Sequence, residues 1–490
     1  MRHGSLASVR VCSARIVTLV LALGLSACET TSPSRSGEYR PEVPEASNMR
    51  LVGWSDLQAR SAYQPVIQRQ GSRYIAYVGH HGGLRVDPQS GKEVQNGTSI
   101  VDVTDPARPR YLTHIPGDTG AGEAGGAQMV RICNGTELPK ADRAKVYMLR
   151  SYGNTAHEVW DVTQPERPAR VAIVAQKLTG THKSWWECDT GIAYLVSGVP
   201  GFGSRRMTQI YDLSDPANPV LIRNWALPGQ EPGAKGKPPA YTLHGPISTG
   251  PKGNRVYFGY GTVSNGLVQI VDRQKLLTGA REPTAANFRE AVITEVATPP
   301  FMGAHTTLPI LGMSVPGLSK YSKGPQHRDV LLVVNESTSN ECNEPRQMVY
   351  IMDITDERTP FGISNFDVPE QPHNFCSRGG RFGAHASNEY QHPAYDKRIV
   401  FISWFNAGLR AVDIRDPYNP KEIAYYIPAI TEKTDRRCVK DASGERCKRA
   451  IQTNNVEVDD RGYVYAVDRA DTGMHILELT GSARAVASFR

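Results

Sequence analysis

The stretch Ile100-Val-Asp-Val-Thr-Asp-Pro-Ala-Arg-Pro109 decides the fold. Its β-branched residues favour a strand, its Asp and Thr side chains can hydrogen-bond the amides of a turn, and its prolines end the strand ladder. The stretch therefore predicts a strand, a tight turn and a second strand that begins near Arg110. Because an isolated hairpin is barely stable in water, the pattern is expected to recur.

It does recur along the chain. Four further strong copies cover residues 159–168, 210–219, 351–360 and 411–420, and weaker copies cover 270–272 and 476–478. A period near ~60 residues with room for four strands is typical of a propeller blade. The sequence thus predicts an all-β fold, a seven-bladed β-propeller of four-stranded blades, as a single domain over residues 49–490.

The last blade needs an outer strand from elsewhere to close the ring. Met49–Trp54 is the preferred segment, and Ala483–Phe489 is the alternative. The sequence of the repeats resembles that of the LVIVD-repeat family of bacterial propellers, and the resemblance runs from about Met49 to the C-terminus. That resemblance implies the architecture and leaves the function open.

The N-terminal segment is typical of exported lipoproteins. Arg10 and Arg15 precede a short apolar run, and Leu25-Ser26-Ala27-Cys28 resembles the lipobox at which Cys28 is lipidated. We expect residues 1–27 to be a signal peptide and residues 28–48 to be a disordered tether rich in Ser, Pro and Glu. The protein is then an envelope lipoprotein, with Glu29 favouring the outer membrane, and it touches the membrane through its anchor alone.

The net charge argues against nucleic-acid binding. The formal charge of +7 falls to about +4 without the leader, and acidic and basic residues are mostly interspersed. We expect a monomer whose partner is a small molecule or protein on one propeller face.

Six cysteines remain after the leader and Cys28 are set aside, which suggests disulfides in an oxidising compartment. Six cysteines allow 15 connectivities. The repeat register places Cys133 and Cys188 at one height on adjacent inner strands, and Cys438 and Cys447 would pin a basic loop. We therefore favour Cys133–Cys188, Cys342–Cys376 and Cys438–Cys447.

Aligned inner strands carry histidine at one position in four consecutive blades: His182, His244, His305 and His385. The other blades carry amides there, and these channel-lining candidates are Gln64, Gln128, Asn454 and Asn455. Inner strands line the propeller axis, so four imidazoles would converge on a nitrogen-rich site for iron, copper or zinc. The alternative is a polar lining without metal.

The spacing of the histidines resembles that in two propeller families with axial metals, the carotenoid cleavage oxygenases and the selenium-binding or methanethiol oxidase proteins. On that resemblance the four histidines would be ligands of iron or copper, although the wider motifs of both families are missing. Carboxylates that orient the imidazoles would be needed, and the candidates by register are Glu187, Glu336, Glu389 and Glu457.

Two function classes follow: an iron- or copper-dependent oxidase or oxygenase, and a non-catalytic scaffold that binds a protein or envelope partner. Two other motifs favour plainer interpretations. His80-His81 is expected in a surface loop, with a place at a channel mouth as the alternative. Trp185-Trp186 is interpreted as blade packing rather than a platform for carbohydrate.

Overall fold

Each strong repeat forms the predicted hairpin in the computed structural model, which describes residues 39–262, 265–315 and 327–489. In the first copy, Asp102 Oδ1 accepts a hydrogen bond from the backbone N–H of Thr104 at 2.9 Å. The equivalent aspartates of the other strong copies make the same bond: Asp161, Asp212, Asp353 and Asp413. A short side chain thus fixes each turn locally.

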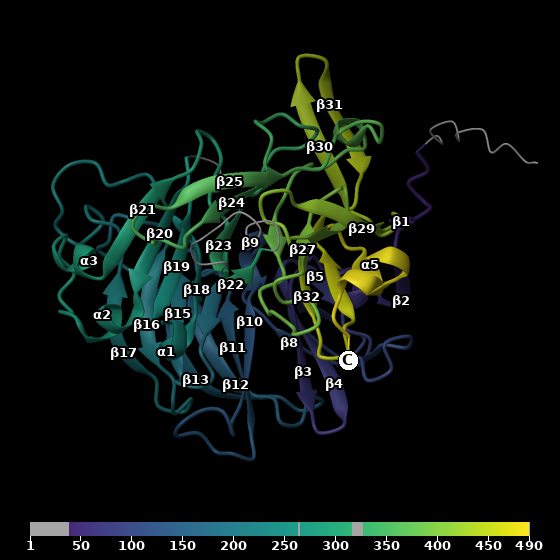
Figure 1. Cartoon of the computed structure of the whole chain (residues 1–490). Coiled ribbons are helices and arrows are strands. Elements are labelled where there is room, and N and C mark those ends of the chain that lie inside the picture. The colour runs from purple at the N-terminus through teal and green to yellow at the C-terminus, as the bar shows by residue number, and fades with distance from the viewer. Residues whose placement is uncertain (1–38, 263–264, 316–326, 490) are drawn as a thin grey trace, which may run out of the picture. The chain divides into compact units, whose positions relative to one another are not determined.

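Seven four-stranded antiparallel blades form a β-propeller, as the repeats predict (Figure 1). The inner strands are β3 (Ala62–Gln70), β10 (Val130–Asn134), β14 (Ser184–Trp186), β18 (Leu243–Ser248), β22 (Thr306–Ser314), β26 (Ala386–Ser387) and β32 (Thr453–Val458). The second strands are β4 (Arg73–Gly82), β11 (Val146–Tyr152), β15 (Ile192–Ser197), β19 (Arg255–Tyr260), β23 (His327–Val334), β27 (Ile399–Ser403) and β33 (Val464–Asp468).

The third strands carry the repeat: β7 (Gly97–Asp102), β12 (Ala156–Asp161), β16 (Met207–Asp212), β20 (Leu267–Asp272), β24 (Val349–Asp353), β28 (Leu409–Asp413) and β34 (Gly473–Leu479). The outer strands are β8 (Arg110–Pro116), β13 (Ala169–Ala175), β17 (Val220–Trp225), β21 (Val292–Ala297), β25 (Phe361–Phe366), β29 (Lys421–Ile427) and, from the chain start, β2 (Met49–Ser55).

Strand β2 closes the ring by pairing with β34 from Met49–Leu479 to Ser55–Met474. The preferred closing segment is therefore confirmed. The alternative is wrong, because Gly481–Val486 forms helix α5, which lies near β2 in Figure 1.

The tether ends earlier than expected. Strand β1 (Glu45–Ser47) pairs with β29 as a fifth strand of the sixth blade, and the Glu45 carboxylate accepts from Arg378. The predicted signal peptide, Cys28 and most of the tether lie outside the described residues.

The remaining elements decorate the blades. Helices α2 (Arg273–Thr278) and α3 (Asn287–Glu290) replace the proline turn of the weak fourth copy, and Asp272 caps α2 through the N–H of Lys275 at 3.0 Å. The rest are β5 (Leu84–Val86), β6 (Glu93–Gln95), β9 (Gly122–Ala127), β30 (Arg436–Asp441), β31 (Gly444–Arg449), α1 (Gly250–Gly253), η1 (Leu57–Ala59) and η2 (Phe375–Ser377).

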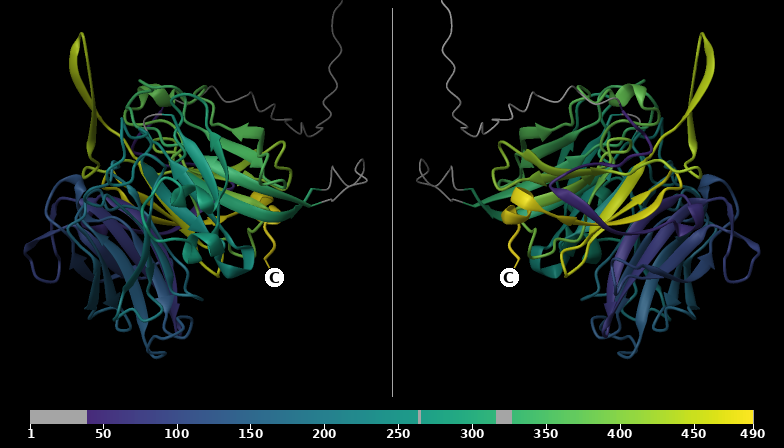
Figure 2. Two further views of the ribbon diagram at one scale, coloured as in Figure 1. Left: turned by 90° about the vertical axis from the view of Figure 1, so that its left-hand side faces the viewer. Right: turned by 90° about the vertical axis from the view of Figure 1, so that its right-hand side faces the viewer.

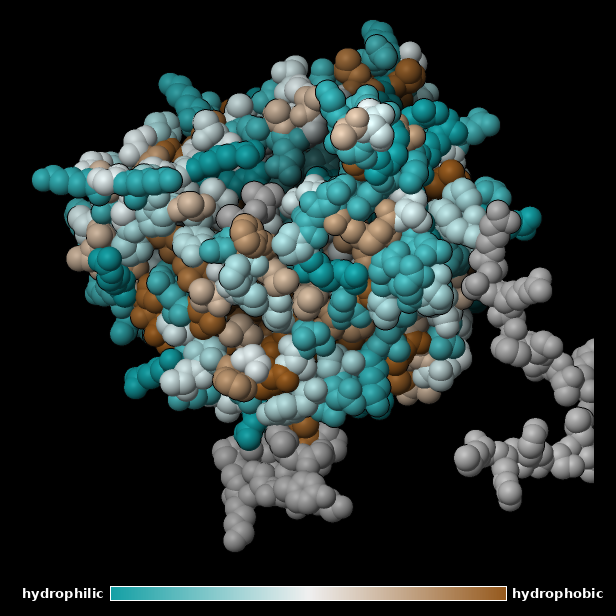
Figure 3. Space-filling view, turned by 90° about the horizontal axis from the view of Figure 1, so that it is seen from above, coloured by the Kyte–Doolittle hydropathy of each residue, from teal (hydrophilic) through white to brown (hydrophobic). Residues whose placement is uncertain are grey.

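The β30–β31 hairpin projects from the ring (Figure 2). From the side on which it projects, the surface is mostly hydrophilic and is hollowed (Figure 3). No helix in the described ranges combines the length and apolar character needed to cross a membrane.

All three favoured disulfides are present: Cys133–Cys188, Cys342–Cys376 and Cys438–Cys447. The first joins blades two and three across a sequence separation of 55, whereas the last crosses one hairpin at a separation of 9. They therefore constrain the unfolded chain to different degrees.

Replacing Cys133 and Cys188 together by Ala is expected to lower the free energy of unfolding by about 4 kcal/mol, because a long loop loses its closure. The matched Cys438→Ala/Cys447→Ala pair should cost about 2.5 kcal/mol. Urea unfolding of both double variants measures the difference. Equal losses would contradict the assignment of the larger constraint to the first bridge.

Candidate axial histidine site

The four repeated histidines lie at the start of four successive inner strands. His244 is the second residue of β18, and His182, His305 and His385 lie within two residues of the first residue of β14, β22 and β26. All four side chains are buried. Since inner strands line the axis, this position turns the imidazoles toward one another.

The imidazoles form one chain of contacts. His182 Nε2 lies 2.9 Å from His244 Nε2. The ring centres of His244 and His305 are 3.5 Å apart, and those of His305 and His385 are 4.4 Å apart. The structure therefore brings together all four histidines that the register aligned.

Backbone carbonyls fix the orientation of two of these rings. His244 Nδ1 donates to the carbonyl of His305 at 2.9 Å, and His385 Nδ1 donates to that of Asn454 at 2.5 Å. Because a carbonyl only accepts, the proton sits on Nδ1 and the lone pair on Nε2. His305 Nδ1 lies 3.0 Å from Thr306 Oγ1, while its Nε2 is buried without a hydrogen-bond partner among the described residues.

Burial lowers the pKa of all four imidazoles well below the ordinary value, and neighbouring positive charge adds to the effect. They are neutral at physiological pH. Neutral imidazole is the form of histidine that binds metals.

Glu336 is the candidate carboxylate that reaches the cluster. Its Oε2 lies 3.9 Å from His305 Nε2, and its Oε1 lies 3.8 Å from His385 Nε2. Arg381 Nη1 donates to the same Oε1 at 3.1 Å. Burial raises the pKa of Glu336, an effect that Arg381 and Arg469 oppose. Ligand-type atoms of His244, His305 and Glu336 all lie within 4.8 Å of one another.

The other three carboxylates find partners elsewhere in the described chain, so their assignment as supports of the imidazoles is wrong. Glu187 pairs with Arg273 at 2.5 Å and with Ser248. Glu389 pairs with Lys183 and Arg131, and Glu457 accepts from the backbone N–H of Glu389 at 3.1 Å. These glutamates follow the histidine position by several residues, and four strand residues span about 13 Å.

The four predicted channel-lining amides differ in how close they lie to the imidazoles. Asn454 lies beside the imidazoles, since its carbonyl accepts from His385. The side-chain amides of Asn455 and Gln64 are 2.6 Å apart, and the amide of Asn455 also lies 3.2 Å from His385 Nδ1. Gln64 in turn lies 3.5 Å from Glu457 Oε1, away from the imidazoles. Gln128 Nε2 donates to the carbonyl of Glu123 at 3.1 Å.

Tyr63, which the sequence reading missed, is the blade-one residue at the histidine level. Its hydroxyl lies 3.2 Å from His182 Nε2, and its ring centre lies 6.0 Å from that of His385. The register of β3 shifts between Ala62 and Pro65, so the alignment on Gln64 was one residue out. The proline after Gln64 was the available signal.

His80 and His81 are buried within β4, so the surface-loop interpretation is wrong. His81 Nε2 accepts from Arg469 Nη2 at 2.8 Å, and its Nδ1 donates to Ser61 Oγ at 3.2 Å. The ring of His81 also packs edge-on against Tyr63.

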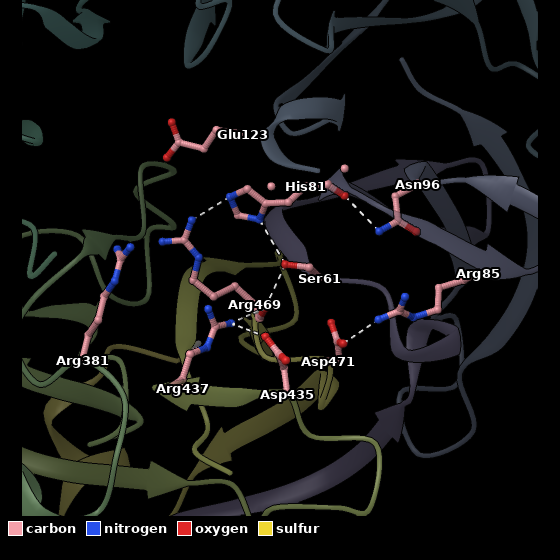
Figure 4. Close-up of a pocket in the computed structure, with 12 residues that line it drawn as sticks. Ser61, His81, Arg85, Asn96, Glu123, Arg381, Asp435, Arg437, Arg469 and Asp471 are labelled. Carbon is pink, nitrogen blue, oxygen red and sulfur yellow. Dashed lines mark hydrogen bonds and ion pairs between the residues drawn. The ribbon is translucent and has the colours of Figure 1, made fainter. Parts of the chain in front are cut away.

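A cavity of about 420 Å³ opens next to this group, and Figure 4 shows its lining. Its walls are polar, and they include Ser61, His81, Asn96, Arg381, Arg437 and Arg469. We call this cavity the channel mouth. It adjoins the imidazoles through Tyr63 and Glu336.

A second cavity of about 570 Å³ lies where the inner strands end. Trp185, Tyr390, Glu389 and Glu457 are part of its lining. Trp186 packs in the core as expected, whereas Trp185 lies half-buried with the guanidinium of Arg131 4.9 Å from its ring centre.

Comparison with known proteins finds distant structural likenesses. No family model and no curated protein sequence matches the chain. Raptor from Chaetomium thermophilum is similar in structure with a TM-score of 0.49 at 11% identity, over 86% of this chain and 30% of that one. A chain of the mitotic checkpoint complex has a TM-score of 0.43 at 10% identity, over 95% and 99% of the two chains.

These likenesses are too weak to carry an argument about activity. This chain spans less than a third of the Raptor chain. The sheet topology establishes the architecture.

Proposed function

We propose that the axial histidines bind one iron or copper ion and that the protein is a metal-dependent oxidoreductase. One observation carries the proposal: His244 and His385 each donate a hydrogen bond from Nδ1 to a backbone carbonyl. The lone pair of each ring is therefore on Nε2, which faces the cluster. That arrangement is the usual support of a metal-binding histidine.

The donor set fits such an ion. Four neutral nitrogens suit iron, copper or zinc rather than magnesium or calcium. Two nitrogens at about 2.1 Å from one ion lie about 3 Å apart at a right angle, and His182 Nε2 and His244 Nε2 are 2.9 Å apart. The buried Nε2 of His305, which has no hydrogen-bond partner in the described ranges, would gain a partner.

The axial histidines would hold the ion, and a redox metal bound there would supply oxygen or one-electron chemistry. The surrounding residues would control access and protons. Burial raises the pKa of Tyr63 well above its ordinary value, so its hydroxyl keeps its proton beside His182. Glu336 places a carboxyl group between the imidazoles and the channel mouth, where it would offset part of the charge of the ion.

Metal content tests the proposal directly. Residues 40–490 exported to the periplasm and purified are expected to hold about one iron or copper ion per chain by element analysis. His244→Ala and His305→Ala should each lower that content by about tenfold or more, since loss of a ligand removes over about 1.4 kcal/mol of binding.

The matched control is His157→Ala, because His157 is buried to the same extent but bonds to the carbonyl of Val196 in another blade. Its metal content should equal that of the parent. Metal-free parent protein after loading with iron(II) and with copper, or equal content in all variants, would refute the metal centre.

The second candidate is a scaffold that binds an envelope partner, and the projecting β30–β31 hairpin favours it. This hairpin presents a run of basic residues and is held by Cys438–Cys447. A metal-free protein that tolerates the histidine substitutions would leave this function standing. In either case the lipobox supports a lipid anchor at Cys28 and a place in the outer membrane.

A further inference from the structure

We propose that the channel mouth binds the carboxylate of a small organic anion, with Arg469 as its principal partner. The inference rests on the proposed function in one respect: this anion is the substrate, or part of it, that approaches the axial histidines. The other arginines of the cavity lining already have carboxylate partners.

Three arginines near the cavity are each matched by an acid. Arg85 Nη2 lies 2.7 Å from Asp471 Oδ2, and Arg437 Nη2 lies 3.3 Å from Asp435 Oδ2. The carboxylate of Glu336 forms an ion pair with Arg381.

The remaining acidic residue of the lining, Glu123, is also paired with an arginine. Arg206 Nη2 lies 2.9 Å from its Oε2. Burial raises the pKa of Glu123, but Arg206, His81 and Arg469 outweigh it and lower the pKa to about 2, so the group is ionised and already neutralised.

Within the described chain, Arg469 is the lining arginine without a close carboxylate partner. Its side chain is 9% exposed, and its nearest carboxylate oxygen is Glu336 Oε1, 3.9 Å from Nη1. Nη2 donates to His81, a neutral base, whereas Nη1 has no hydrogen-bond partner among the described residues. Burial lowers the pKa of Arg469 to about 10, and Arg381 adds to the effect, so the guanidinium stays charged at neutral pH.

A second unmatched cation lies behind the cavity wall. Arg60 is fully buried, and its Nη1 donates to Asn96 Oδ1 at 2.7 Å, an uncharged partner. The mouth therefore carries positive charge without enough carboxylates of its own. A buried charge without a counter-ion is unfavourable, and an anionic ligand removes that cost.

The position of Arg469 suits a substrate. Figure 4 shows its guanidinium beside His81, with Arg381 on the same side of the cavity. Glu336 and Tyr63 separate this point from the imidazoles, so a carboxylate held here would leave the rest of the molecule close to them. The cavity has the volume of a small-ligand site, and its charged walls disfavour a long apolar substrate.

Benzoate, with benzamide as its neutral isostere, probes the site. Calorimetric titration at low ionic strength uses residues 40–490, both freed of metal and loaded with metal. Benzoate should bind saturably and benzamide should not. Arg469→Gln should weaken benzoate binding by about tenfold or more, since a hydrogen bond to a charged group is lost.

Arg85→Gln is the matched control, because Arg85 lines the same cavity but already has Asp471. It should change the benzoate affinity by less than about threefold. If Arg469→Gln unfolds, Arg469→Lys keeps the charge and should weaken binding to a smaller extent, since the planar fork is lost. Inorganic phosphate distinguishes a general oxyanion site from one for carboxylates.

Equal responses to benzoate and benzamide, or binding indifferent to Arg469, would overturn the inference. Metal content separates this result from the proposed function. Arg469-dependent benzoate binding by a protein that takes up no metal would support the anion site and refute the metal centre. Stoichiometric metal without benzoate binding would support the metal centre and refute the anion site.

Discussion

A chain that begins at Asp56, and so lacks β1 and β2, is expected to lose about 5 kcal/mol or more of its free energy of unfolding. The loss combines the backbone hydrogen bonds between β2 and β34, each contributing about 1 kcal/mol, with the burial of Met49, which contributes about 2–5 kcal/mol. It also leaves β34 as an open sheet edge. Urea unfolding followed by circular dichroism, compared with residues 40–490, measures the effect.

A point variant tests closure without shortening the chain. A Cβ at Gly53 would lie 2.0 Å from the carbonyl oxygen of Pro106, so Gly53→Val must push β2 off the neighbouring blade. The matched control is Arg50→Ala, in the same strand, where the side chain is 68% exposed and pairs with Glu478. The control should cost less than about 1 kcal/mol. If Gly53→Val proved as stable as the parent, β2 would not be essential for closure.

The second large effect is expected at a buried ion pair in blade two. Arg150 Nη2 lies 3.0 Å from Glu158 Oε2, and their side chains are 1% and 3% exposed. Arg150 also donates to the carbonyls of Ile115 and Pro116 in blade one, and its guanidinium lies 4.8 Å from the ring centre of Trp160. The pair thus joins two blades through one guanidinium.

Glu158→Gln should lower the free energy of unfolding by about 3–5 kcal/mol, because it leaves a buried cation without its counter-ion. Urea unfolding measures this loss. Arg150→Met/Glu158→Gln should recover part of it, since both charges are then absent. Glu166→Gln breaks an exposed pair with Arg73 and should cost under about 1 kcal/mol. A Glu158 effect no larger than this control would contradict the prediction.

The repeats made the architecture predictable because their information is local. Each Asp side chain fixes its own turn two residues later, so the strand before and the strand after can be recognised without tertiary knowledge. The histidine register was predictable for a related reason: the same position recurs at the start of successive inner strands. Strand β1 was missed because three residues, Glu45-Ala46-Ser47, are too few to show such periodicity.

The contacts around the imidazoles could not be predicted in this way, since they join residues far apart in the chain. Arg469 lies 388 residues from His81, its hydrogen-bond partner. Glu336 follows the second strand β23, whose end lies beside His305 at the start of the inner strand, whereas Glu187 follows the inner strand β14. Its pairing with Arg381 and its approach to His305 emerge only in the folded chain. Tyr63 was hidden by an irregularity in β3 that shifts the pairing by one residue.

The pairing of β1 with blade six and of β2 with blade seven has a mechanical consequence. Tension applied from the N-terminal side, as a lipid anchor would apply it, reaches β1 first. Because β1 is an added fifth strand, its detachment would leave the sheet of blade six with four strands and the β2–β34 seam intact. A pulled molecule can thus lengthen by a few residues before the force acts on the strand that holds the circle shut.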